Sequence, residues 1–152
     1  MIAKHFSYNP LPHTLIYAGS IPFIAGAVLL MSDVSTVPLL GNVRDITAAY
    51  GLLIAVFLTG IHWGQELSLS HVRPRLFISS NLIALIIWLS WLLFSPEVFM
   101  AMLTLPYLVL LYIDLILCRK NFIDQDYYRS RLVITLVVIC SLLVASLSSW
   151  KK

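Results

Sequence analysis

The chain has 152 residues, of which 60% are hydrophobic and 11% are charged, and its mean hydropathy is +0.92. A soluble globular domain has about 45–50% apolar and about 25% charged residues, so this composition excludes an ordinary soluble fold and indicates an integral membrane protein. The formal net charge is +3, but no basic block is interleaved with aromatic residues, which argues against nucleic-acid binding. Cys118 and Cys140 form no C-x-x-C pair and indicate neither a disulfide framework nor a zinc site.

The apolar segments predict an all-α integral membrane fold, a five-transmembrane-helix bundle forming a single membrane domain over residues 1–152. The expected helices are about 14–31, 47–67, 76–94, 98–117 and 131–150. Each is close to the ~20 residues that cross ~30 Å of hydrocarbon. Pro22 is expected to kink the first helix, and Pro106 to interrupt the fourth. Residues 32–46 are expected to form a polar loop, and 119–130 a long connection before the last helix.

The basic residues predict the orientation of these helices. Five crossings place the two termini on opposite sides of the membrane. The side of the N-terminus then holds seven basic residues: Lys4, Arg73, Arg75, Arg119, Lys120, Arg129 and Arg131. The other side holds three: Arg44, Lys151 and Lys152. Because cytoplasmic loops carry the excess of Lys and Arg, the N-terminus is predicted to be cytoplasmic and the C-terminus outside.

The end of the second helix carries the residues that stand out most. His62, Trp63 and Glu66 close an apolar run, and an ionisable side chain inside such a run is costly enough to mark a candidate functional site. His62 and Glu66 are four residues apart, so they are neighbours on one helix face. Gly60 and Gly64 form a G-x-x-x-G pattern, which is expected to let another helix backbone approach closely.

The other helices are expected to bring polar side chains to the same cytoplasmic level. Asp114 should turn inward from the fourth helix and find a partner, with Arg131 first, Arg119 second and His62 third. The predicted pocket residues are His62, Trp63, Glu66, Asp114, Arg131, Asn81, Tyr17 and Tyr127. Two interpretations stay open here, because Asp114 with Arg131 could be a purely structural ion pair between two helices, and His62 a hydrogen-bonded interior histidine.

Three stretches resemble a known family: GSIPF over 19–23, AYGLLIAVFLTGIHWG over 49–64 and YYRSRLVIT over 127–135. They are similar to the I-P-F, G-x-H-W-G and W-Y-x-x-L-R-x-x-L-T elements of the domain-of-unknown-function family 3429, which includes the transmembrane protein 69-like group. In the third element Tyr127, Arg131 and Thr135 are in register, whereas Asp126 and Ser130 replace the usual tryptophan and leucine. The resemblance implies a bacterial inner (plasma) membrane or mitochondrial protein without an established activity, and it supports His62, Trp63 and Arg131 as site residues.

Several function classes stay open, and the sequence favours a non-enzymatic one. The first is an accessory or assembly subunit of a membrane complex, respiratory complexes included, because the chain is small and has no recognisable catalytic set. Its candidate packing faces are Gly60 with Gly64, and Ser141 with Ala145 and Ser149. The second is a binder of a quinone or a lipid head group in the cytoplasm-facing pocket.

Two further classes are less favoured. A proton-coupled transporter would use Asp114 or His62 as its relay. A metal or haem enzyme would need more ligands than His62, Glu66 and Asp114 provide, so no metal or cofactor is predicted beyond a bound quinone or lipid. The expected partners are the lipid bilayer and either another membrane protein or a second copy of the chain, and no nucleic acid.

Overall fold

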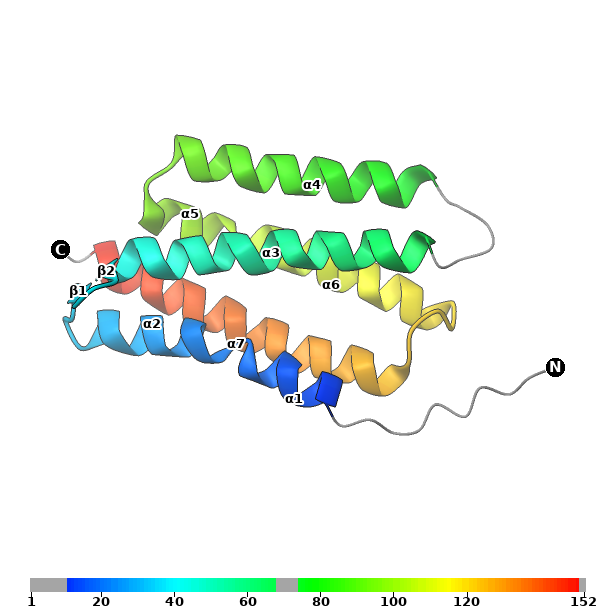
Figure 1. The fold of residues 1–152 in the computed structure, drawn as a ribbon, viewed down its shortest axis with the longest axis horizontal. Helices are drawn as coiled ribbons and strands as arrows, with labels where there is room; N and C mark the ends of the chain where they lie inside the picture. Colours follow the sequence, from blue (N-terminus) through cyan, green and yellow to red (C-terminus); the bar gives the residue numbers. More distant parts are fainter. Residues whose placement is uncertain (1–10, 68–73, 151–152) are drawn as a thin grey trace.

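The computed structural model describes the backbone of residues 11–67 and 74–150, and the side chains of residues 14–64 and 77–150. Its elements are α1 (Leu11–Ala18), α2 (Ile21–Met31), β1 (Thr36–Val37), β2 (Gly41–Asn42), α3 (Val43–Leu67), α4 (Pro74–Leu93), α5 (Pro96–Met102), α6 (Thr104–Arg119) and α7 (Gln125–Trp150). The helices lie side by side along the long axis of the molecule (Figure 1). The α1–α2 and α5–α6 pairs each form one interrupted rod, so the helices group into five rods, as predicted from the sequence.

Four of the described helical segments are long and apolar enough to cross a membrane: Thr14–Met31, Val43–Gly64, Pro96–Arg119 and Gln125–Trp150. The apolar part of α4 is shorter and covers Phe77–Leu93. Length and composition therefore support a multi-pass membrane protein with four full-length spans and one shorter apolar helix.

Both predicted helix interruptions are present, and each has a proline close behind it. The first rod breaks at Gly19 and Ser20, and Pro22 is the second residue of α2. This break frees the carbonyl of Gly19, which accepts a hydrogen bond from the Tyr50 hydroxyl of α3 at 3.1 Å. The fourth rod breaks at Leu103, because a proline at position 106 has no N–H to donate to the carbonyl four residues earlier.

Two boundaries differ from the predicted ones. The α3 helix begins at Val43 rather than 47, and the preceding segment, predicted as a polar loop, contains the antiparallel β1–β2 hairpin. The hairpin turn is closed by two left-handed residues, Leu39 and Gly41, with φ of 70° and 95°. The α7 helix begins at Gln125 rather than 131, so the predicted connection of residues 119–130 shrinks to 120–124. Tyr127 is therefore helical, one turn before Arg131.

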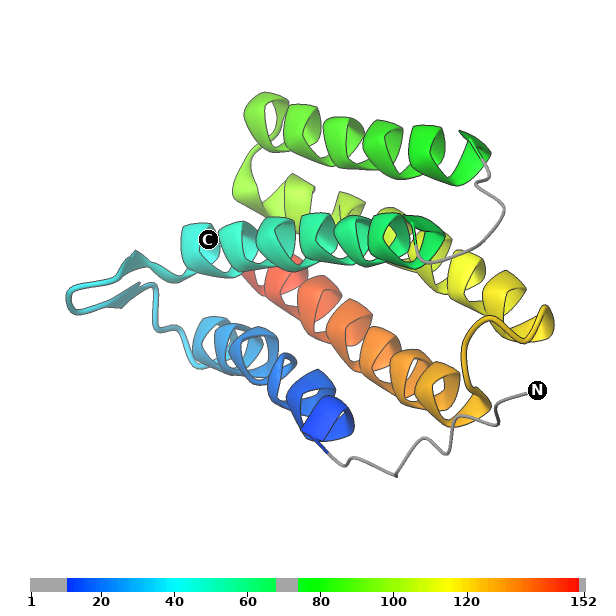
Figure 2. The ribbon, with the colours of Figure 1, turned by 45° about the vertical axis from the view of Figure 1, so that its right-hand side comes forward.

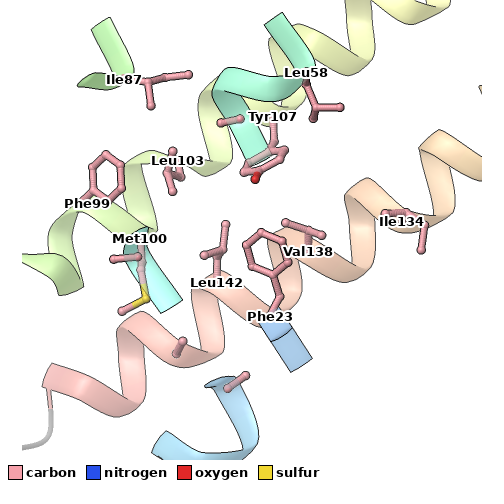
Figure 3. Close-up of a cluster of buried hydrophobic side chains, with 14 of the residues drawn as sticks. Phe23, Leu58, Ile87, Phe99, Met100, Leu103, Tyr107, Ile134, Val138 and Leu142 are labelled. Carbon is pink, nitrogen blue, oxygen red and sulfur yellow. The ribbon is translucent and has the colours of Figure 1, made fainter. Parts of the chain in front are cut away.

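The α7 helix is the centre of the packing. It contacts the α1–α2 rod, α3, α5 and α6, and its buried residues recur every three or four positions along its length. The predicted packing face of Ser141, Ala145 and Ser149 belongs to this buried series, so it packs within the bundle. Figure 3 shows Leu142 of α7 in the core between Phe23 and Leu103.

The α4 helix is the outermost rod. It packs mainly on α3, with a smaller contact to α5, and both ribbon views show it at the edge of the molecule, away from α7 (Figure 1, Figure 2). Polar residues of α4 are therefore badly placed to reach a site that is built around α7.

Two glycines outside the G-x-x-x-G pattern allow close helix contacts. A Cβ added at Gly51 would lie 2.7 Å from Leu103 Cδ1, and one added at Gly26 would collide with the Thr47 side chain. By contrast, none of the described residues lies within 4 Å of a Cβ added at Gly60 or Gly64. The G-x-x-x-G pattern therefore makes no close helix contact with the described part of this chain, and its role in packing stays a prediction.

Candidate functional site

Three rods contribute one side chain each to a buried polar cluster. Asp114 from α6 lies between His62 of α3 and Arg131 of α7: its Oδ1 is 2.8 Å from His62 Nε2, and its Oδ2 is 3.0 Å from Arg131 Nε. The side chains of His62 and Asp114 are each 2% exposed and that of Arg131 is 8% exposed. Of the predicted partners, Asp114 thus contacts both Arg131 and His62.

The cluster forms because each residue occupies the buried face of its helix. Asp114 follows Tyr107, Leu110 and Leu111 along the inner face of α6, so the carboxylate must enter the bundle with them. A carboxylate in this environment needs a compensating charge and hydrogen bonds, which the guanidinium and the imidazole supply.

His62 uses only one of its two ring nitrogens within the described part of the chain. An ionised carboxylate only accepts hydrogen bonds, so the His62 hydrogen sits on Nε2. His62 Nδ1 is buried and has no hydrogen-bond partner among the described residues.

A groove of about 180 Å³ runs beside this cluster. Its walls come from the α1–α2 rod, α3, α6 and α7, and most of its lining is apolar, including Phe23, Ile54 and Val138. The remaining wall carries Tyr127, Arg131 and Thr135, which lie four residues apart on one face of α7. The groove therefore has a polar edge along an otherwise hydrocarbon-like channel.

The polar edge of the groove is well buried. Arg131 and Thr135 are 6% and 2% exposed, and Tyr127 is half-buried. The Thr135 hydroxyl has no hydrogen-bond partner within the described part of the chain. Asp114 engages Arg131 at Nε, which leaves the two Nη groups of the guanidinium as donors for another acceptor.

Three of the predicted pocket residues do not join this arrangement. Tyr17 is exposed, and Trp63 is exposed on α3, where its ring packs edge-on against Phe77 of α4 with the centroids 4.9 Å apart. Asn81 is also exposed and lines a separate depression between α3 and α4, because α4 packs on the outside of the bundle. The Glu66 side chain lies outside the described residues. The structure thus groups His62, Asp114 and Arg131, and places Tyr127 in the groove with Arg131.

Sequence reasoning about the site residues missed Thr135. Two signals could have identified it: it follows Arg131 by one helical turn, and it is in register with the third element of the family resemblance. Its hydroxyl alone carries no signal in a sequence, because most helical threonines satisfy their own hydrogen bonds.

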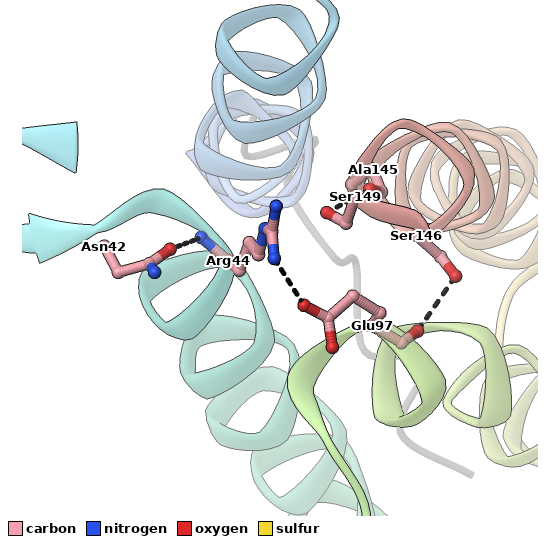
Figure 4. A network of polar contacts seen from close by, with 6 residues as sticks. All are labelled: Asn42, Arg44, Glu97, Ala145, Ser146 and Ser149. Carbon is pink, nitrogen blue, oxygen red and sulfur yellow. Dashed lines mark hydrogen bonds and ion pairs between the residues drawn. The ribbon is translucent and has the colours of Figure 1, made fainter. Parts of the chain in front are cut away.

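Sequence reasoning also missed a second polar network at the opposite end of the bundle. Arg44 Nη1 of α3 pairs with Glu97 Oε1 of α5 at 2.9 Å, and Ser146 Oγ of α7 donates to the Glu97 carbonyl at 2.8 Å (Figure 4). This network joins three rods near the β1–β2 hairpin. Arg44 lies in the segment predicted as a polar loop, and Glu97 lies in the connection between the third and fourth predicted helices, so their pairing was not expected.

Comparison with known proteins agrees with the resemblance seen in the motifs. Residues 8–147 match a family described as "Protein of unknown function (DUF3429)". No curated protein and no solved structure matches the chain. Because the match covers most of the sequence, this chain belongs to the DUF3429 family of proteins of unknown function.

Proposed function

We propose that this protein is a multi-pass membrane protein that binds an amphiphile, such as a quinone or a lipid, in the groove beside α7. The observation that carries the proposal is the row of half-buried Tyr127 and buried Arg131 and Thr135 along an otherwise apolar groove. Such a combination suits a ligand with a hydrocarbon body and a polar end.

The unmet hydrogen-bonding capacity of the groove supports this proposal. A buried hydroxyl without a partner costs about 1–3 kcal/mol, and a ligand acceptor at Thr135 Oγ1 would recover part of this. The Arg131 guanidinium is held in place by Asp114, so its Nη groups are positioned before any ligand arrives.

The size of the groove limits how much of the ligand it encloses. Its volume of about 180 Å³ is below the range of roughly 300–1,000 Å³ that is usual for sites enclosing a drug-sized molecule. We expect the groove to hold the head group and the first part of the chain, while the rest of the chain lies in the bilayer.

The experiment is to purify the protein with its native lipids and to identify the amphiphiles that remain bound by mass spectrometry. Ile54→Trp fills the groove, and Leu53→Trp places the same ring on the exposed face of α3 as a matched control. We expect at least a tenfold loss of one bound species in Ile54→Trp and none in Leu53→Trp. Equal amounts of every species in the wild type and both variants would refute groove binding.

The other predicted functions stay predictions. An accessory subunit of a membrane complex does not need this groove, so amphiphile binding is the better-supported proposal. A proton relay through His62 and Asp114 would need a continuation from the buried cluster across the bundle. The second polar network, which contains Arg44 and Glu97, is already engaged in contacts of its own.

We also propose that the chain lies in the bacterial inner membrane with its N-terminus in the cytoplasm and its C-terminus outside. The excess of Lys and Arg on the N-terminal side of five crossings supports this orientation. Reporter enzymes fused to the C-terminus give the test: a reporter active only outside the cytoplasm should be active there. If a reporter that is active only in the cytoplasm were active at the same position, the chain would have the opposite orientation and the proposal would be refuted.

A further inference from the structure

We infer that the head group bound in the groove is uncharged and carries carbonyl oxygens, as a quinone ring or an acyl ester does. This inference rests on the proposed amphiphile binding and narrows it to one chemical class. Two features of the groove wall formed by α7 lead to it: the pairing of Arg131 with Asp114, and the unused hydrogen-bond donors of Tyr127, Arg131 and Thr135.

The charges next to the groove already balance. Arg131, the charged residue of the groove lining, is paired with Asp114 of opposite charge at 3.0 Å. An anionic head group at Arg131 would therefore introduce an uncompensated negative charge close to the Asp114 carboxylate, in surroundings with little water to screen it. A cationic head group would meet the like charge of Arg131. An uncharged head group avoids both costs.

The remaining polar groups of the groove are hydrogen-bond donors. The guanidinium can only donate, and the Tyr127 and Thr135 hydroxyls each carry one donor hydrogen. No Asp or Glu is present in the groove lining. A head group that matches this wall must therefore present acceptor oxygens, and a carbonyl is an uncharged group that does so strongly.

Thr135 is the most informative of these donors. In α3, Thr47 and Thr59 donate their hydroxyl hydrogens to backbone carbonyls of the preceding turn, at 2.8 and 2.7 Å. Thr135 is just as deeply helical and belongs to the groove lining, but its buried hydroxyl makes no such bond with any described residue. A ligand oxygen that reaches this buried hydroxyl would give its hydrogen an acceptor.

The test compares the affinities of three probes for the purified full-length protein in detergent. Decylubiquinone and dioctanoylglycerol carry carbonyls on a ring and on esters, respectively, and dodecyl phosphate is anionic. We expect at least one carbonyl probe to bind at least tenfold more tightly than dodecyl phosphate. Whichever carbonyl probe binds better identifies the source of the head group, and either result supports the inference.

Thr135→Val and Thr135→Ser give matched variants. Valine keeps the shape of the side chain but removes the donor. It should therefore lower the affinity for the carbonyl probe about three- to tenfold, as expected for one hydrogen bond, and leave the affinity for dodecyl phosphate unchanged. Serine keeps the donor and should retain most of the affinity. Because the hydroxyl has no partner within the described protein, Thr135→Val should unfold at a temperature no lower than the wild type, which separates a ligand role from a structural one.

Three outcomes would overturn the inference. Tightest binding of dodecyl phosphate, lost in Ile54→Trp, would refute the uncharged head group while leaving amphiphile binding in the groove intact. Unchanged carbonyl binding in Thr135→Val would remove the donor argument. If none of the three probes bound the wild-type protein more tightly than the Ile54→Trp variant, the proposed function itself would be refuted.

Discussion

Replacing Asp114 by Asn tests whether the buried polar cluster is essential to the fold. The change keeps the size of the side chain but removes the charge that compensates Arg131, whose Nε lies 3.0 Å from the carboxylate. Because the two side chains are 2% and 8% exposed, little solvent is available to replace the lost charge. Breaking such a buried pair from one side costs about 3–5 kcal/mol of unfolding free energy.

The ion pair at the opposite end of the bundle supplies the matched control. Glu97 and Arg44 are 18% and 23% exposed and 2.9 Å apart, so Glu97→Gln removes a charge of the same sign from a better solvated pair. That change should cost about 1 kcal/mol or less, since solvent and lipid head groups can take over part of the interaction. The contact distances in the two ion pairs are nearly equal, so the pairs differ in burial and in the second contact that Asp114 makes with His62.

The assay is equilibrium unfolding of the purified protein in mixed micelles with increasing SDS, followed by circular dichroism. The double variant Asp114→Asn with Arg131→Met removes both charges. Its loss of unfolding free energy should be smaller, by at least about 2 kcal/mol, than the sum of the losses in the two single variants. The reasoning fails if Asp114→Asn costs no more than Glu97→Gln, or if the two single changes simply add.

Two further predictions concern packing and can be measured by the same unfolding experiment. Gly51→Ala should lower the unfolding free energy by about 1–3 kcal/mol, because its Cβ would lie 2.7 Å from Leu103 Cδ1. Gly60→Ala meets open space, so it should be neutral or should stabilise α3 by up to about 1 kcal/mol. Equal effects of the two changes would show that the two helix faces are equally crowded. Tyr107→Phe removes the hydrogen bond from its hydroxyl to the Gly51 carbonyl, 3.0 Å long, and should cost about 1 kcal/mol. The exposed Tyr112 gives the control, and a Tyr112→Phe variant as unstable as Tyr107→Phe would contradict this assignment.

The two polar networks also explain how a bundle of apolar rods acquires one arrangement. Apolar faces pack in many registers at similar free energy, but a buried ion pair is compensated in only one of them. Asp114 fixes the positions of α3, α6 and α7 at one end, and Glu97 joins α3, α5 and α7 at the other. Both networks include α7, in agreement with its central place in the packing.

The sequence by itself determined the five apolar rods, the interruptions near Pro22 and Pro106, and the inward turn of Asp114 toward Arg131. These features are local, because the solvation cost of a segment or a charge depends on the residues that carry it. The family resemblance was likewise readable from the motifs alone.

Only the tertiary structure decided which helix faces meet. Asn81 and Gly60 stand on faces that the bundle leaves outside, while Thr135 lines the groove, and residue type alone cannot separate these cases. The physical reason is that an isolated helix tolerates a polar or small residue equally well on any of its faces. The environment of such a residue is fixed only by the rotation of each rod about its axis and by the distance between rods. Both depend on all the contacts along α7 together.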